Sequence, residues 1–121
     1  MEATTVARQI ALGRLALGGV ISVAPGLVTR IWVGEVTTAT KVLGAGFGVR
    51  DVAIGAGLWR ALDTGGDARP WLLAGAAGDV ADFAATFAAR RSLPLVGRIG
   101  VAAFAASGAA LSVWAARQVA P

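Results

Sequence analysis

The chain has 121 residues, a length suited to one domain, and it contains neither cysteine nor histidine. Hydrophobic residues make up 56% of it and charged residues 15%, against about 25% charged residues in an ordinary soluble domain. This composition excludes a disulfide framework, thiol chemistry and imidazole catalysis, and it leaves too few polar residues to cover a soluble surface. We therefore predict an integral membrane protein whose first partner is the lipid bilayer.

The net charge of +4 rests on ten arginines and one lysine, which are scattered at segment ends and inside apolar segments. A nucleic-acid-binding protein would gather such cations on one solvated face, so no nucleic acid is expected as a partner. The preference for arginine over lysine, with abundant alanine and glycine, is typical of a high-GC bacterial genome. We expect a multi-pass protein of the bacterial cytoplasmic (inner) membrane.

Four apolar segments each have about the length that crosses a bilayer. Helices of about 20 residues, rising about 1.5 Å per residue, match the hydrocarbon core of about 30 Å. The predicted fold class is all-α: one domain over residues 1–121, with four transmembrane helices in a compact antiparallel bundle. The helices are expected at residues 7–24, 40–62, 70–89 and 95–117, with a short interfacial segment between the first two.

The first segment carries Arg14 in its interior and ends at Pro25 and Gly26, residues that commonly terminate helices. Its basic residues lie within the apolar stretch rather than before it, so we do not expect a cleavable signal peptide. Residues 27–33 are amphipathic and include Trp32, a combination typical of a short segment at the headgroup level.

The second segment carries adjacent charges, Arg50 and Asp51, in its middle. It also contains Gly44 and Gly48 at the spacing that lets helix backbones approach closely in membranes. Further glycines in the third segment repeat this spacing, so a tight bundle without a wide pore is expected. A polar, glycine-rich loop at residues 63–67 follows.

Pro70 suits the first turn of the third helix, which carries Asp79 and Asp82. A basic turn at residues 90–94 precedes the fourth segment, which contains the long uncharged run 99–116. Five basic residues fall at the predicted face without the termini and four at the face with them. Because basic residues favour the cytoplasmic side, we expect both termini outside.

Counting from the loops places the charges of three helices at one depth. Arg50 lies 16 residues before Gly66, the middle of the second loop, and Asp82 lies 16 residues after it. Arg14 falls at the same level, and Asp79 shares a helix face with Asp82. Charged groups inside membrane spans are costly unless paired, so we predict the pairs Arg50–Asp82 and Arg14–Asp79.

With Asp51 included, the layer of charged residues at this depth contains three aspartates and two arginines. It therefore has one carboxyl group in excess. Neighbouring residues on a helix point about 100° apart, so Arg50 and Asp51 are expected to reach different helices. Ser107 on the fourth helix falls at a similar level and is expected to donate a hydrogen bond to the layer.

The leading functional hypothesis is a non-catalytic carrier or accessory subunit. In it Arg14, Arg50 and Ser107 would bind a small polar or anionic ligand. Further copies of the chain, or a larger membrane complex, are the other expected partners. No cofactor and no metal are expected, since the nearby arginines disfavour a cation among the carboxylates and no phosphate-binding loop is present.

The alternative hypothesis is a membrane-embedded enzyme acting on a lipophilic substrate. Asp51, Asp79 and Asp82 would be its catalytic carboxylates, one acting as base and another as acid. An epoxide hydrolase has this kind of Asp–Arg–Asp set, and an isomerase or cyclase is also compatible with it. This hypothesis requires a pocket that reaches the charged layer, and the sequence leaves the question of catalysis open.

Gly-Val-Arg-Asp at residues 48–51, with Gly-Asp-x-x-Asp at residues 78–82, resembles uncharacterised small four-helix integral membrane proteins of high-GC bacteria. The resemblance covers most of the chain and implies the four-helix membrane fold without an activity. Two other groups of similar size do not match. The first helix lacks the glutamate of small multidrug exporters, and the chain has no asparagine, which fluoride channels carry.

Overall fold

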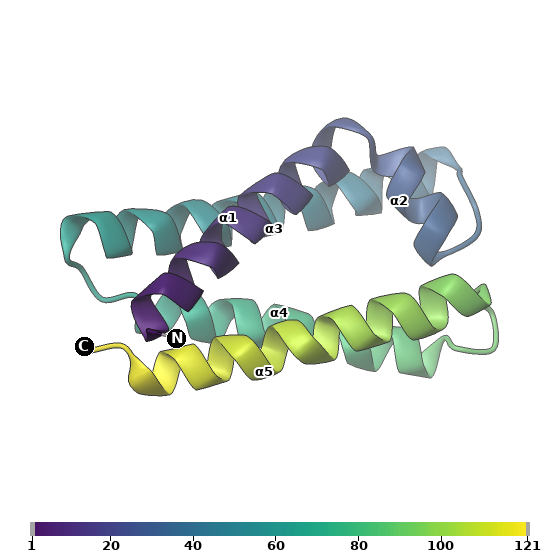
Figure 1. The fold of residues 1–121 in the computed structure, drawn as a ribbon. Helices are drawn as coiled ribbons and strands as arrows, with labels where there is room; N and C mark the ends of the chain where they lie inside the picture. Colours follow the sequence, from purple (N-terminus) through teal and green to yellow (C-terminus); the bar gives the residue numbers. More distant parts are fainter. Residues whose placement is uncertain (1, 121) are drawn as a thin grey trace.

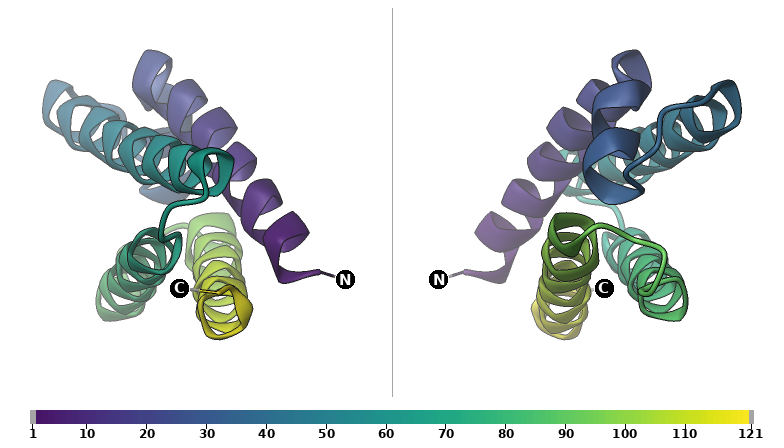
Figure 2. Two further views of the ribbon diagram at one scale, coloured as in Figure 1. Left: turned by 90° about the vertical axis from the view of Figure 1, so that its left-hand side faces the viewer. Right: turned by 90° about the vertical axis from the view of Figure 1, so that its right-hand side faces the viewer.

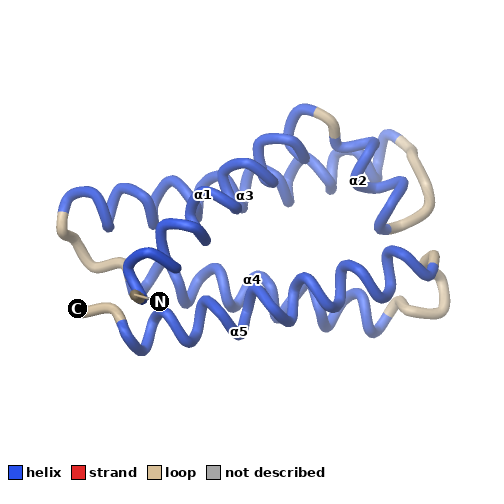
Figure 3. The backbone as a smooth tube through the Cα atoms, in the orientation of Figure 1, coloured by secondary structure: helices blue, strands red, loops and turns tan. Residues whose placement is uncertain are grey.

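The computed structural model describes residues 2–120, which are helical apart from short connections and include no strand. The all-α fold class is thus confirmed, with helix bounds within a few residues of those expected (Figures 1 and 3). The elements are α1 (Ala3–Val23), α2 (Pro25–Trp32), α3 (Thr38–Thr64), α4 (Arg69–Ala88), the π-helical turn η1 (Gly97–Val101) and α5 (Ala102–Gln118).

Three helices are long and apolar enough to cross a membrane, which indicates a membrane protein. They are α1, α3 and the continuous helix Gly97–Gln118 formed by η1 and α5. Although α4 has 20 residues, it is not among these three. Its two aspartates, Asp79 and Asp82, lower the hydropathy of an otherwise apolar helix.

Local sequence explains where the helices begin and end. Pro25 ends α1 and, because its fixed φ suits a first turn, also begins α2. The side chains of Thr37 and Thr40 exchange hydrogen bonds with each other's backbone N–H groups at the start of α3. Gly65 ends α3 with φ of 69°, a left-handed conformation that glycine adopts without strain.

The long helices pack as two pairs, α1 against α3 and α4 against α5 (Figure 2). Contacts between the two pairs are fewer, and Figure 1 shows the pairs diverging toward the end that carries α2. Both chain ends and the α3–α4 turn lie at the opposite end (Figure 1).

Glycines bring the backbones of α1 and α3 into contact, as the spacing predicts. A methyl group added at Gly18 would lie 2.6 Å from the carbonyl oxygen of Gly48. One added at Gly48 would lie 2.6 Å from the backbone nitrogen of Ser22. These distances are too short for a real side chain, so both positions require glycine for this helix crossing.

The glycines of α4 have a different role from the predicted one. A methyl group at Gly75 would lie 2.7 Å from a terminal nitrogen of Arg14, and one at Gly78 would lie 3.4 Å from Cζ of Arg50. These glycines therefore accommodate guanidinium groups rather than another helix backbone. Arginine side chains and a cavity thus lie between α4 and the α1–α3 pair.

Candidate functional site

Arg14 on α1 joins two aspartates from two other helices. Its two terminal nitrogens, Nη1 and Nη2, donate hydrogen bonds to Oδ1 of Asp51 on α3 at 3.1 Å and to Oδ2 of Asp79 on α4 at 2.6 Å. Gly75 leaves the room that the guanidinium group occupies, and Gly108 on α5 does the same for the Asp79 carboxylate. Arg14 thus links α1, α3 and α4 through one buried group.

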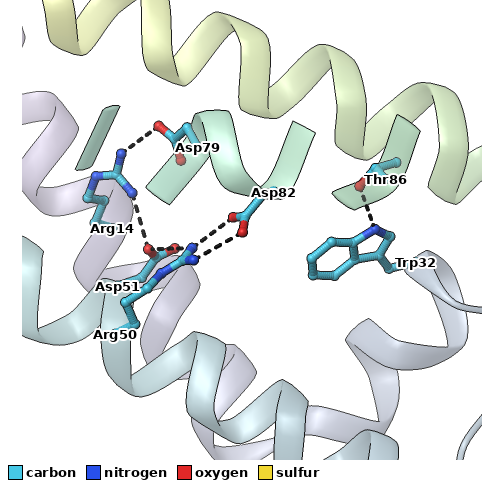
Figure 4. A network of polar contacts seen from close by, with 7 residues as sticks. All are labelled: Arg14, Trp32, Arg50, Asp51, Asp79, Asp82 and Thr86. Carbon is cyan, nitrogen blue, oxygen red and sulfur yellow. Dashed lines mark hydrogen bonds and ion pairs between the residues drawn. The ribbon is translucent and has the colours of Figure 1, made fainter. Parts of the chain in front are cut away.

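Arg50 on α3 forms a two-pronged pair with Asp82 on α4, at 3.0 Å through Nη1 and 2.7 Å through Nη2 (Figure 4). This geometry matches the planar guanidinium to the planar carboxylate and is among the stronger side-chain interactions. The two predicted pairs, Arg50–Asp82 and Arg14–Asp79, are therefore confirmed.

Arg50 also contacts its neighbour Asp51, at 3.4 Å from Nη2 to Oδ1. The expectation that these two residues reach different helices holds, since Arg50 binds Asp82 on α4 and Asp51 accepts from Arg14 on α1; the direct contact between them was not expected. The Arg50 side chain is long enough to turn back toward Asp51 while holding Asp82. Asp51 Oδ1 thus accepts from both Arg14 and Arg50 and joins the two predicted pairs into one network.

We call Arg14, Arg50, Asp51, Asp79 and Asp82 the charged layer. Arg14, Asp51 and Asp79 are each 8% exposed, whereas the side chain of Arg50 is 32% exposed. With every group ionised, three carboxylates and two guanidinium groups leave a charge of −1. The layer is therefore largely shielded, is unbalanced in charge, and has one member that is open to its surroundings.

Aromatic and hydroxyl groups that sequence reasoning missed lie beside the layer. The guanidinium of Arg50 lies 4.7 Å from the centre of the Phe47 ring, and Phe47 meets Trp32 edge to face at 4.9 Å. Trp32 Nε1 donates a hydrogen bond to Oγ1 of buried Thr86 at 3.1 Å, which ties α2 to α4 (Figure 4). The helical spacing of Phe47 to Arg50 is a signal that could have found the first contact.

A cavity of about 650 Å³ lies between the two helix pairs on the side of α2. Its volume falls within the range of about 300–1,000 Å³ usual for small-molecule sites. The layer forms one wall through Arg50 and the three aspartates, and Trp32 lines it farther along. Most of the remaining lining is apolar, including Leu43, Val96 and Phe104. The cavity therefore combines apolar walls with one charged wall.

Ser107 is not part of this site. It is exposed, and its hydroxyl donates to the carbonyl oxygen of Ala103 on its own helix at 2.8 Å. The expectation that it donates to the charged layer is wrong, because it has the right depth along α5 but faces another direction. Gly108, the next residue, is the one that meets the Asp79 carboxylate.

The arrangement allows hydrogen bonding and proton transfer at the end of an apolar space. Within residues 2–120, the carboxylates are not grouped in a way that could hold a metal ion. No protein-family model, curated protein or solved structure matches the chain.

Proposed function

We propose that this protein binds a lipophilic small molecule in the cavity, with the polar end of the molecule at the charged layer. It would act as a non-catalytic carrier or accessory subunit of a membrane. The observation that supports this most strongly is the position of the layer at one wall of an otherwise apolar cavity. Sites for small molecules typically combine apolar walls with a few convergent polar groups.

The exposure of Arg50 distinguishes this proposal from a purely structural network. A network whose members were all equally shielded would offer no group to a ligand. Here the Arg50 side chain is 32% exposed, whereas those of Arg14, Asp51, Asp79 and Asp82 are 10–15% exposed. The cavity lies on the side of the layer that carries Arg50.

We further propose that α4 crosses the membrane together with the three apolar helices, giving four antiparallel spans. Each charged group in a span costs roughly 2.5–3.5 kcal/mol on an insertion scale. Both aspartates of α4 are paired with arginines from α1 and α3, which offsets much of that cost. The membrane would be the bacterial cytoplasmic membrane, with both termini outside.

The test is chemical analysis of what the protein retains when it is purified in detergent from its membrane. Ala85 lines the cavity, and its neighbour Ala84 is also exposed but does not line it. Ala85→Phe should narrow the cavity and obstruct a bound chain, and Ala84→Phe is the matched control. Lipophilic molecules extracted from each protein would be measured by mass spectrometry.

A molecule retained in near-stoichiometric amount by the wild type and by Ala84→Phe, and lost from Ala85→Phe, is the expected result. Equal retention by both variants would mean that the molecule binds outside the cavity. Absence of any retained molecule, even after lipophilic compounds are added back, would count against the proposal.

A catalytic alternative is supported by one specific contact: Arg14 hydrogen-bonds to both Asp51 and Asp79 at the cavity wall. In an epoxide hydrolysis, Asp51 would take a proton from water as the water oxygen bonds to an epoxide carbon. Asp79 in its acid form would give a proton to the epoxide oxygen as the carbon–oxygen bond breaks. Asp82 is fully occupied by Arg50 and would hold that arginine in place.

The catalytic alternative is tested with 1,2-epoxydodecane and purified protein. Turnover to the diol should fall about 10²–10⁴-fold in Asp51→Asn, the range usual for loss of a general base. Diol formation no faster than in protein-free micelles would remove this alternative and leave the carrier proposal untouched.

A further inference from the structure

Every terminal nitrogen of the two arginines in the charged layer already donates to an aspartate. Both terminal nitrogens of Arg14 donate to aspartates, one to Asp51 and one to Asp79. Both terminal nitrogens of Arg50 donate to Asp82, and one of them also reaches Asp51. Neither Nε group donates a hydrogen bond within residues 2–120, and Arg50 Nε is fully buried. An incoming anion would therefore meet guanidinium groups that are already paired with carboxylates.

The acceptors of the layer are not all engaged. Asp82 uses both of its oxygens on Arg50. Asp51 accepts only through Oδ1 and Asp79 only through Oδ2, so each leaves one oxygen without a hydrogen bond within residues 2–120. Both residues line the cavity, and neither spare oxygen is fully enclosed by protein. Figure 4 shows the two carboxylates on either side of the Arg14 guanidinium group.

The net charge of the layer also disfavours an anionic ligand. With every group ionised, three carboxylates and two guanidinium groups leave one negative charge beside an apolar space, where charges are weakly screened. A second negative charge placed there would be repelled, whereas a positive one would be attracted. A cationic donor to a carboxylate also forms a hydrogen bond roughly twice as strong as a neutral one.

We propose that the ligand of this cavity has an apolar body and a head group that donates hydrogen bonds and carries no negative charge. An amine head should bind more tightly than an alcohol head. The head would donate to the free oxygens of Asp51 and Asp79, and the body would extend along the apolar walls toward Trp32. This inference rests on the proposed function of the cavity. It replaces the anionic ligand that the arginines alone suggest.

The experiment compares three probes that differ only in their head: 12-bromododecylamine, 12-bromododecan-1-ol and 12-bromododecanoic acid. The protein keeps Trp32 as its only tryptophan, with Trp59, Trp71 and Trp114 replaced by phenylalanine. Bromine quenches nearby indole fluorescence, so quenching of Trp32 reports a bound chain. Each probe is titrated in nonionic micelles at pH 7, and Ala85→Phe supplies the level of non-specific quenching.

The expected order of affinity is amine, then alcohol, then carboxylate, with the amine at least about tenfold tighter than the carboxylate. Equal or tighter binding of the carboxylate would overturn the inference while leaving the proposed function intact. If no probe quenches Trp32 more in the wild-type background than in Ala85→Phe, the proposed function itself fails.

A second variant tests whether the charged layer causes the preference for the amine over the carboxylate. Asp51→Asn removes the excess negative charge and converts a spare acceptor into an amide. The ratio of amine to carboxylate affinity should then fall about tenfold or more. A ratio unchanged from the wild type, in a variant with wild-type helix content, would show that the head does not bind at Asp51.

Discussion

Arg14 is the residue on which the charged layer depends most, because it bonds to aspartates on two other helices. Its removal leaves three carboxylates with only one cation. Arg14→Gln should therefore lower the free energy of unfolding by about 3–5 kcal/mol, the usual cost of breaking a buried ion pair. Unfolding in detergent, followed by circular dichroism, measures this loss.

Asp51 is the matched comparison, since its loss brings the layer to two carboxylates and two cations. Asp51→Asn should cost only about 1 kcal/mol, the value of a typical hydrogen bond, because the amide oxygen can still accept from Arg14. A cost equal to that of Arg14→Gln would contradict the idea that one carboxylate is in excess.

The Arg50–Asp82 pair permits an exchange of charges. Arg50→Ala and Asp82→Ala should each destabilise the fold by about 2 kcal/mol, less than a fully buried pair because Arg50 is partly exposed. The double variant Arg50→Asp with Asp82→Arg should recover part of this loss. If the double variant lost as much stability as Arg50→Asp and Asp82→Arg lose when their separate effects are added, the two residues would not stabilise each other directly.

Sequence reasoning predicted both main ion pairs because depth along a helix follows directly from residue count. It failed for Ser107, since equal depth does not fix the direction in which a side chain points around the helix axis. It also missed the contact between Arg50 and Asp51, because the direction of Cβ ignores how far a long side chain reaches. The contact between Phe47 and Arg50 could have been predicted, because residues three apart on a helix lie side by side.

At the scale of elements, the crossing of α1 and α3 depends on glycine. Gly48→Ala would place a methyl group against the backbone of α1 and should destabilise the fold by about 1–3 kcal/mol, as overpacking usually does. Gly46 is the control, because a methyl group there meets nothing within 4 Å. Gly46→Ala should be neutral or slightly stabilising, since alanine favours a helix. Equal melting temperatures for Gly48→Ala and Gly46→Ala would contradict the close crossing of α1 and α3.

The short helix α2 is tied to α4 by a hydrogen bond from Trp32 to Thr86. Thr86→Val removes the acceptor but keeps the shape, at a cost of about 1 kcal/mol. Hydrogen exchange in α2 should then accelerate about fivefold, because local opening becomes easier by that amount. Thr5→Val, at an exposed position of α1, should leave the exchange of α2 unchanged. Unaltered exchange in Thr86→Val would mean that other contacts hold α2.

The existence of α2 was predictable from its amphipathic sequence and its Trp32, but its docking was not. The partner, Thr86, lies 54 residues away, and nothing in the local pattern of α4 distinguishes it from other small residues. The roles of Gly75 and Gly78 escaped prediction for a related reason. Glycine spacing indicates a close approach without telling whether a backbone or a guanidinium group approaches.

At the scale of the whole molecule, composition alone indicated a membrane protein, because so few polar residues cannot cover a soluble surface. The cavity could not be read from the sequence. It arises because α1–α3 and α4–α5 pack as separate pairs, with the cavity between them on the side of α2. The charged layer is where the two pairs meet, so the same residues hold the pairs together and face the space between them.

The central claim is that a lipophilic molecule occupies this space with its head at the charged layer. The most direct test is quenching of Trp32 fluorescence by 12-bromododecan-1-ol in protein that has no other tryptophan. We expect saturable quenching in the Ala84→Phe background and only linear, non-specific quenching in the Ala85→Phe background. Identical quenching curves in the two backgrounds would contradict it.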